Sequence, residues 1–282
     1  HPVNRRQRQM CIRDSPRIIS NWIFVMIRKV FKYKTFLWGH AWPQTGIKSW
    51  SEKIRNIMRE LSSGVIVYSE KQKKELKKKS PKLKVFTAVN ALYHEKTLIY
   101  KISDNDEVKN IVYSGRLTKQ KKVMKLLKAY ADAIDLLDKK ANLIIIGSGP
   151  LKQKVLEFIN KNKLKDRVFL KGKIYDKNTL EKIYNTALCS ISPGYVGLSI
   201  IQSFSFGVPM IVSKNENHSP EIDAVIENQN AVYEERSLSE TMLKFFNNKH
   251  YWISRRAHIK RHSQENYTIE KMAMPFFEIL KA

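Results

Sequence analysis

Short apolar runs and longer amphipathic stretches alternate along the chain from Pro16 onward. A short run rich in Val, Ile and Leu is typical of a buried strand. An apolar residue at every third or fourth position is typical of a helix that covers a sheet. Strands and helices in this alternating order form parallel sheets with helices packed on their faces. The pattern therefore predicts an α/β protein.

The first part of the chain accounts for about half of a doubly wound domain. Helices are expected at 15–30, 49–61 and 70–79, and strands at 35–38, 65–68 and 85–89. The segment 90–109 has no clear period and carries a polar cluster, which is typical of a connection between domains. We therefore expect an incomplete N-terminal Rossmann-like domain, together with its linker, at 16–108.

A fuller series begins at Asn110. Strands are expected at 111–114, 143–146, 168–171, 189–192, 210–212 and 231–233, with helices between them and two final helices at 251–265 and 269–280. Six parallel strands with covering helices make a complete Rossmann-like domain. We place this second domain at 109–265.

The start of the chain departs from this alternation. Residues 5–15 show neither strand alternation nor a helical apolar stripe. The same string resembles translated sequencing-adapter sequence. We therefore expect 1–15 to be a non-native segment that contributes nothing to the fold.

Composition limits the class of protein. A chain of 282 residues that is 43% hydrophobic can form two ordinary domains. Cys11 and Cys189 fit neither a disulfide framework nor a metal-ligand spacing, so a reducing, cytoplasmic setting is expected. The longest apolar run, 18–27, is interrupted by Ser20 and Asn21 and is shorter than the roughly 20 residues that cross a bilayer.

The net charge of +26 requires an explanation. A non-catalytic protein that binds a polyanion, either nucleic acid or a membrane surface, is one hypothesis. Against a nucleic-acid site, the lysines are spread along the chain and suit solvated helix faces, as at Lys71, Lys73, Lys74, Lys77, Lys78, Lys79, Lys82 and Lys84. Two interpretations fit a group of basic and aromatic residues early in the chain equally well: contact with an anionic membrane leaflet, or a solvated face. These residues are Arg17, Trp22, Arg28, Lys29, Lys32 and Lys34.

Two cations follow the first strand of the second domain. Gly115 permits a sharp turn after that strand, and Arg116 and Lys121 come next. Cations at the carboxyl edge of a parallel sheet lie where open α/β folds bind ligands. Arg116 and Lys121 are therefore candidates to bind a diphosphate.

Glycines follow the next strand as well. Gly147 and Gly149 precede a helix whose first amides can face an anion. A nicotinamide-dependent dehydrogenase is the rival interpretation. Its fingerprint fails because Lys152 stands where close packing of helix on strand requires Gly or Ala.

A third glycine-containing turn follows the strand at 189–192. Pro193 and Gly194 end that strand, and Gly197 precedes a helix whose first amides, at Leu198 and Ser199, are candidates to bind phosphate oxygens. Taken alone, this is an ordinary strand-helix-strand unit.

Together these segments resemble the C-terminal domain of the family 4 retaining glycosyltransferases. A Gly-Arg-Leu-x-x-x-Lys motif is matched by Gly115, Arg116, Leu117 and Lys121, an Ile-Gly-x-Gly-Pro motif by 146–150, and a Val-x-x-x-Gly motif by 168–172. The resemblance implies the GT-B fold, in which two Rossmann-like domains face each other across a cleft. It also implies that Arg116 and Lys121 bind the donor diphosphate and that Lys171 and Gly172 lie beside the nucleotide base.

The usual pair of glutamates in this family is absent. Gly194 and Gln202 stand at the matching positions. Gln202 can still accept a hydrogen bond from a ribose hydroxyl, whereas Gly194 offers only backbone groups. Glu221, further along, is a candidate to supply a carboxylate near the site, although a glutamate in a first helical turn is commonly dipole compensation.

The resemblance also reaches the first domain and the end of the chain. His40 follows a strand at the place where family members carry an active-site His facing the donor sugar. Residues 266–282 resemble the terminal segment that crosses back to the N-terminal domain. A complete member has a whole N-terminal domain, so the chain is expected to be truncated and either weakly active or inactive.

The function implied is transfer of a sugar, with retention, from a UDP- or GDP-sugar to a glycan or lipid-linked acceptor in cell-surface polysaccharide or lipopolysaccharide biosynthesis. No metal or other cofactor is expected, and no nucleic-acid partner. The implied location is cytoplasmic, with peripheral contact at the inner face of the plasma membrane. The alternatives are a polyanion-binding protein and an inactive fragment of the transferase.

Overall fold

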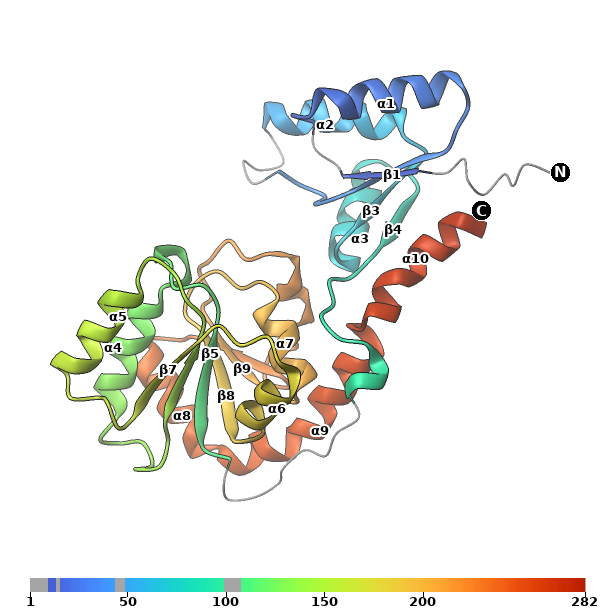
Figure 1. Ribbon diagram of the computed structural model, residues 1–282. Helices are drawn as coiled ribbons and strands as arrows, with labels where there is room; N and C mark the ends of the chain where they lie inside the picture. Colours follow the sequence, from blue (N-terminus) through green and yellow to red (C-terminus); the bar gives the residue numbers. More distant parts are fainter. Residues whose placement is uncertain (1–9, 14–15, 44–48, 99–107, 282) are drawn as a thin grey trace. The chain divides into compact units, whose positions relative to one another are not determined.

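The chain folds into two compact units, described here from a computed structural model (Figure 1). The structure describes residues 10–13, 16–43, 49–98 and 108–281. The first unit comprises residues 1–91 and 269–282, and the second unit comprises residues 92–268. Both units are built on parallel sheets covered by helices, so the α/β class predicted from the sequence is confirmed.

The first unit contains a four-stranded parallel sheet in the order β1-β2-β3-β4. Its strands are β1 (Met10–Arg13), β2 (Thr35–Trp38), β3 (Gly64–Val67) and β4 (Val85–Thr87), and its helices are α1 (Ile19–Val30), α2 (Trp50–Leu61), α3 (Glu70–Lys79) and α10 (Ile269–Lys281). In Figure 1, α1 lies beside α2. The predicted strands and helices of this unit all occur, with ends shifted by a few residues.

The two faces of this sheet bury different helices. Leu37, Val65 and Val67 pack with core residues of α1, α2 and α3. Phe36 and Ile66 point to the other face, where they pack with Ile279 of α10. This division follows from the alternation of side chains along a strand.

Strand β1 was not predicted. It pairs with β2 in parallel, from Met10 opposite Thr35 to Arg13 opposite Trp38. The sequence pattern had offered no strand before Pro16, and residues 1–9 and 14–15 lie outside the described residues. The expectation that 1–15 is non-native stays a prediction. A strand at the edge of a sheet pairs with one neighbour through backbone hydrogen bonds. Such a strand can therefore form without an alternating apolar pattern in its sequence.

The second unit contains a six-stranded parallel sheet in the order β10-β9-β8-β5-β6-β7. Its strands are β5 (Asn110–Ser114), β6 (Leu143–Ile146), β7 (Val168–Gly172), β8 (Ala187–Ser192), β9 (Met210–Val212) and β10 (Ala231–Tyr233). Its helices are α4 (Val123–Ala133), α5 (Lys152–Lys161), α6 (Lys177–Asn185), α7 (Ser199–Ser205), α8 (Leu238–Asn247) and α9 (Lys249–Asn266), with short 3-10 turns η2 (Glu95–Leu98), η3 (Lys119–Lys121) and η4 (Pro220–Ala224).

This order places β5 and β8 at the centre of the sheet. In chain order within the unit the strands run 3-2-1-4-5-6 from β7 to β10, which is the doubly wound arrangement. The strand order reverses between β5 and β8, so their carboxyl ends flank the crevice where such sheets bind ligands. Ile111 and Ile145 pack into the core on one face, and Val112 and Ile144 on the other.

Candidate functional site

The candidate site lies at the carboxyl ends of β5 and β8 in the second unit. The chain leaves β5 through Gly115 and Arg116 into η3, and leaves β8 through Pro193 and Gly194 toward α7. The two loops meet, because the backbone N–H of Tyr195 donates to the carbonyl of Gln120 at 3.3 Å. The strand-order reversal is therefore flanked by the segments that the sequence singled out.

Lys121 links these two loops. Its ammonium donates a hydrogen bond to the carbonyl oxygen of Tyr195 at 2.7 Å and lies 4.4 Å from the centroid of the Tyr195 ring. A Cβ atom placed on Gly197 would be 3.9 Å from the same Nζ atom. Lys121 and the backbone at Gly197 thus share one side of the sheet edge.

Arg116 adds a second positive charge at this edge. Its side chain is exposed, and its carbonyl oxygen accepts from the Tyr113 hydroxyl at 3.0 Å. The pKa of Lys121 is lowered chiefly by burial and then by the charge of Arg116, while Glu221 acts in the opposite direction. Arg116 and Lys121 repel each other, and Lys121 is partly desolvated, so the positive potential at this edge favours an anionic ligand.

Glu221 reaches this neighbourhood from η4. Its carboxylate accepts a hydrogen bond from the Ser219 hydroxyl, and it is buried to 9% exposure. The backbone N–H of Ser219 in turn donates to the carbonyl of Val196, in the loop after β8, at 3.2 Å. Glu221 is therefore held against the same loop that carries Gly197.

The sequence reasoning missed His218, which also holds this loop. Its Nδ1 accepts from the backbone N–H of Val196 at 3.0 Å, and its Nε2 lies 2.8 Å from the carbonyl oxygen of Ser213. Because Nδ1 accepts, the ring is a neutral tautomer that donates from Nε2. Burial lowers the pKa of His218, which favours that neutral form. A lone His outside any motif gave no signal for this role.

Gly194 stands where the resemblance places the first glutamate of the family motif. A Cβ atom there would lie 2.4 Å from the carbonyl oxygen of Gln120 and 3.0 Å from the carbonyl carbon of Lys121. The backbone of η3 therefore fills the space in which a side chain would start. The loop that presents Lys121 can approach β8 this closely only because residue 194 is Gly.

Gln202 stands where the resemblance places the second glutamate, and its amide forms hydrogen bonds within the protein. Its Oε1 accepts from the Ser114 hydroxyl at 2.6 Å and from the Tyr184 hydroxyl at 3.2 Å, and its Nε2 donates to the Tyr93 hydroxyl at 3.4 Å. A carbonyl oxygen has two lone pairs, and both are used. In this structure Gln202 joins α7 to β5, α6 and the start of the second unit instead of presenting a vacant acceptor.

Replacing Gln202 by leucine is expected to lower the free energy of unfolding by about 2 kcal/mol, because the buried Tyr184 hydroxyl and Ser114 lose their acceptor. Chemical denaturation measures this loss. Gln153→Leu is the control, since Gln153 is exposed on α5 and pairs with Glu157 of its own helix. A variant with unchanged stability but weakened nucleotide binding would contradict the structural role and favour a ribose contact.

The glycines after β6 and β7 line the adjoining part of the edge. Gly147 donates its backbone N–H to the carbonyl of Gly172 at 2.7 Å, and Gly115 donates to the carbonyl of Ile146 at 2.9 Å. Gly149 approaches the backbone of Leu117 closely. The strand ends β5, β6 and β7 are therefore connected through their turns, as the three glycine-containing motifs require.

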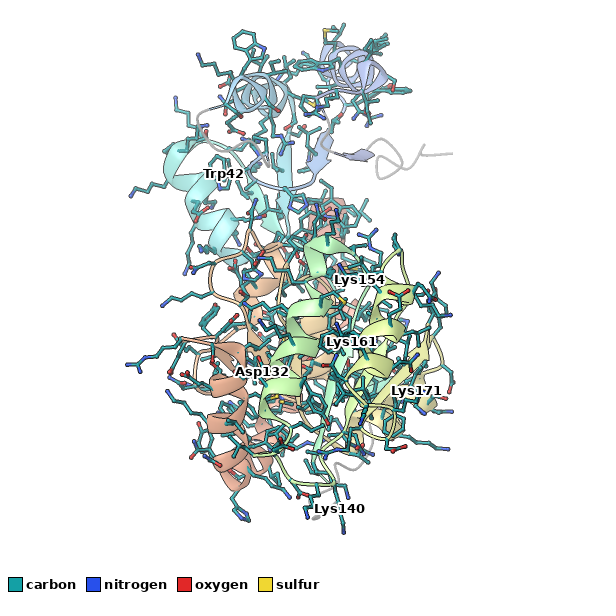
Figure 2. The ribbon with its side chains drawn as sticks, turned by 90° about the vertical axis from the view of Figure 1, so that its left-hand side faces the viewer. Trp42, Asp132, Lys140, Lys154, Lys161 and Lys171 are labelled. Carbon is teal, nitrogen blue, oxygen red and sulfur yellow. The ribbon has the colours of Figure 1, made fainter. Side chains whose placement is uncertain are left out.

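The other predicted residues belong to different elements. Lys171 projects from the edge strand β7, with β6 between it and β5, and its ammonium lies 5.5 Å from the ring of Phe169 (Figure 2). Helix α7 begins at Ser199, next to the exposed Leu198, and has only seven residues. His40 belongs to the first unit, where its ring lies 4.9 Å from that of Tyr68 and its carbonyl accepts from Arg55 at 2.8 Å.

The positive charge is dispersed over the surface of the second unit. Figure 2 labels Lys154 and Lys161 of α5, Lys171 of β7, and Lys140 in the loop before β6, and all four are exposed. A hollow of about 630 Å³ in the first unit is lined by residues that precede β3 and β4, including Ser63 and Lys84. It lies at the amino ends of these strands, away from the carboxyl edge where His40 follows β2. Within the described ranges, His, Cys, Asp and Glu side chains form no group of three suited to a metal ion.

Residues 95–266 match the profile of the family described as Glycosyl transferases group 1. The chain is also 26% identical, over 211 residues, to an uncharacterized glycosyltransferase of Methanocaldococcus jannaschii, MJ1059. That match covers 66% of this chain and 50% of MJ1059. The chain thus spans about half the length of this curated relative.

Several solved structures have a fold similar to that of this chain. A TarM mutant of S. aureus in complex with fondaparinux, α-GlcNAc-glycerol and UDP matches with a TM-score of 0.66 at 19% identity, over 88% of this chain and 51% of that chain. Sucrose-phosphate synthase from Thermosynechococcus elongatus matches with a TM-score of 0.72 at 18% identity, over 97% and 73%. Anabaena HepE in complex with UDP matches with a TM-score of 0.71 at 13% identity, over 96% and 78%. These likenesses identify the paired Rossmann-like architecture of GT-B transferases.

Proposed function

The chain belongs to the group 1 glycosyl transferases, and we propose that its second unit binds the nucleoside diphosphate of a UDP- or GDP-sugar for retaining transfer. The proposed acceptor is a glycan or a lipid-linked glycan of cell-surface polysaccharide or lipopolysaccharide biosynthesis. The observation that carries the proposal is the meeting of Arg116, Lys121 and the backbone at Gly197 at the carboxyl ends of β5 and β8.

The chemistry follows from charge. When the bond between the sugar and the diphosphate breaks, negative charge develops on the departing phosphate oxygens. A guanidinium and an ammonium fixed beside those oxygens stabilise that charge without reorganising during the reaction. Lys121 is held in place by the Tyr195 carbonyl before any ligand arrives, so its position is set in advance. The acceptor hydroxyl attacks on the face that the phosphate leaves, and the phosphate takes its proton.

The neighbouring groups have proposed roles as well. The negative charge of Glu221 raises the pKa of Lys121, and we assign to Glu221 the role of the acid that Gly194 cannot supply. Gly147, Gly149, Lys171 and Gly172 border the nucleoside, and the first amides of α7, at Leu198 and Ser199, add to the binding of phosphate oxygens. The role of His40 at the donor sugar stays a prediction.

Titration calorimetry tests this function. We expect UDP or GDP to bind saturably, and Lys121→Met to weaken that binding about tenfold or more, because a charge-assisted contact to phosphate is lost. Lys119→Met is the matched control, since Lys119 is an exposed lysine of the same η3 turn. A chain that binds neither nucleotide, and instead binds a short oligonucleotide in a salt-sensitive manner, is a polyanion-binding protein.

A further inference from the structure

We propose that His218 is a positioning residue: it orients the peptide group that joins residues 195 and 196, and this peptide group holds the ammonium of Lys121 where a diphosphate binds. The proposal rests on the proposed function of the second unit and adds a consequence to it, which is a donor affinity that depends on the protonation of His218. All of the contacts that carry it lie within the second unit.

A single peptide group lies between Lys121 and His218. It joins Tyr195 to Val196, so it carries the carbonyl oxygen of the first residue and the N–H of the second. The oxygen accepts from Nζ of Lys121 at 2.7 Å, and the N–H donates to Nδ1 of His218 at 3.0 Å. A trans peptide group is planar, with its C=O and N–H on opposite sides. A change of orientation at the imidazole therefore also moves the oxygen that holds the ammonium.

The loop after β9 fixes His218 from the other side of its ring. Nε2 of His218 lies 2.8 Å from the carbonyl oxygen of Ser213, which directly follows β9. The next residue in the chain, Ser219, donates both its backbone N–H and its hydroxyl to the carbonyl oxygen of Val196, at 3.2 and 3.0 Å. The orientation of the peptide group is thus set by this loop before any ligand binds.

Protonation of His218 removes the acceptor on which this arrangement depends. A neutral imidazole accepts at one nitrogen and donates from the other, whereas an imidazolium donates from both. The N–H of Val196, a fully buried residue, would then face a second N–H group. A buried donor without an acceptor is unfavourable, so the peptide group must turn away. Lys121 then loses the carbonyl oxygen that holds its ammonium.

Charged groups reach His218 from three directions. Burial is the main cause that lowers the pKa of His218, and the charge of Lys121 on η3 acts in the same direction. The hydrogen bond to the residue after β9 and the charge of Glu216, in the same loop, act in the opposite direction. Glu216 is itself paired with Lys122 at the start of α4, and Glu221 of η4 acts on Lys121. The ring is therefore neutral at pH 7, and it gains a proton below the ordinary pKa of about 6.5.

The direction of the pH dependence separates positioning from simple electrostatics. A protonated His218 adds a positive charge near the edge where an anion binds, and this charge alone would tighten binding. Loss of the acceptor at Nδ1 predicts the opposite result. The neutral ring that supports binding predominates above about pH 6.5 and is lost as the pH falls through the lowered pKa of the folded protein. Donor affinity should therefore fall with pH.

Titration calorimetry with UDP and GDP, at about pH 8 and about pH 5, tests the proposal. His218→Asn is the reference, because its amide oxygen can accept from Val196 and does not titrate. Its affinity relative to that of the unaltered chain should rise about threefold or more as the pH falls. This ratio cancels the titration of the terminal phosphate of the nucleotide. His218→Phe has no acceptor and should bind about fivefold more weakly than the unaltered chain at about pH 8.

Two further variants show whether His218 acts through Lys121. Lys121→Met/His218→Phe should bind only slightly more weakly than Lys121→Met, because the second change has no ammonium left to misplace. His262→Asn is the matched control for pH, since His262 is another partly buried His of the second unit, on α9, whose pKa burial lowers. It should keep the pH dependence of the unaltered chain. Thermal unfolding at each pH checks that every variant is folded.

The outcomes separate this inference from the proposed function. The role of His218 is overturned if His218→Asn and the unaltered chain share one pH dependence, if His218→Phe binds normally, or if the losses in the double variant add. In each of these cases nucleotide binding by the second unit still stands. If neither UDP nor GDP binds at either pH, the proposed function is overturned, and the inference is overturned with it.

Discussion

Replacing Arg116 by alanine is expected to lower the turnover of the proposed sugar transfer about a hundredfold. Arg116 stands at the carboxyl end of β5, and its charge acts on Lys121 across the same crevice. A preorganised cation at the departing phosphate contributes roughly 3 kcal/mol to the stabilisation of the transition state, which corresponds to two orders of magnitude in rate. Turnover is measured as nucleoside diphosphate released from a UDP- or GDP-sugar in the presence of acceptor.

The stability of this variant separates catalysis from folding. The Arg116 side chain is exposed, and the hydrogen bond from Tyr113 reaches its backbone carbonyl, which alanine retains. The midpoint of thermal unfolding should therefore stay close to that of the unaltered chain. Lys119→Ala, in the neighbouring turn, should keep full turnover. Near-normal turnover of Arg116→Ala would remove Arg116 from the site.

Replacing Gly147 by alanine is expected to lower the free energy of unfolding of the second unit by about 3 kcal/mol or more. Gly147 has a φ of +142°, and a Cβ atom there would lie 1.9 Å from the carbonyl oxygen of Gly115. The backbone of Gly115 cannot move out of the way of the added methyl group as a flexible side chain could. The turns after β5 and β6 must therefore separate. Their hydrogen bonds, from Gly115 to Ile146 and from Gly147 to Gly172, are then strained.

A second glycine on the same edge provides the matched control. Gly172 has a φ of +71°, but nothing lies within 4 Å of the position of its Cβ atom. Gly172→Ala should cost only the strain of a left-handed backbone, about 1 kcal/mol. Chemical denaturation of the two variants compares a steric clash with backbone strain alone. Equal losses would show that the contact between Gly147 and Gly115 does not determine stability.

The strands were largely predictable because their apolar runs end at turns. The expected ranges 35–38, 143–146, 210–212 and 231–233 coincide with β2, β6, β9 and β10. Helix α1 begins at Ile19 instead of residue 15, because the chain is still extended at Ile18 after Pro16. Strand β1 was not predicted from the sequence, and its parallel pairing with β2 identifies it.

Parts of the candidate site depend on contacts that spacing does not encode. The resemblance suggests that Gly194 and Gln202 stand in the places of two acids, but the sequence does not indicate that the backbone of Gln120 occupies the space beside Gly194. Gln202 meets Ser114, a residue 88 positions away, and this contact decides where its amide oxygen is used. By contrast, Arg116 and Lys121 were accessible to sequence reasoning, because both follow one strand within a single short motif.

The packing of α10 shows how the two units can be taken apart. Ile279 fills the face of the first sheet that carries Phe36 and Ile66, and Phe276 meets Trp38 with ring centroids 5.1 Å apart. In topological terms the second unit is an insertion within the first. A recombinant first unit that stops at Ala91 would leave that apolar face bare and prone to aggregate. Joining Ala91 to Ile269 through a short flexible linker keeps α10 in the recombinant unit, where it can pack on that face.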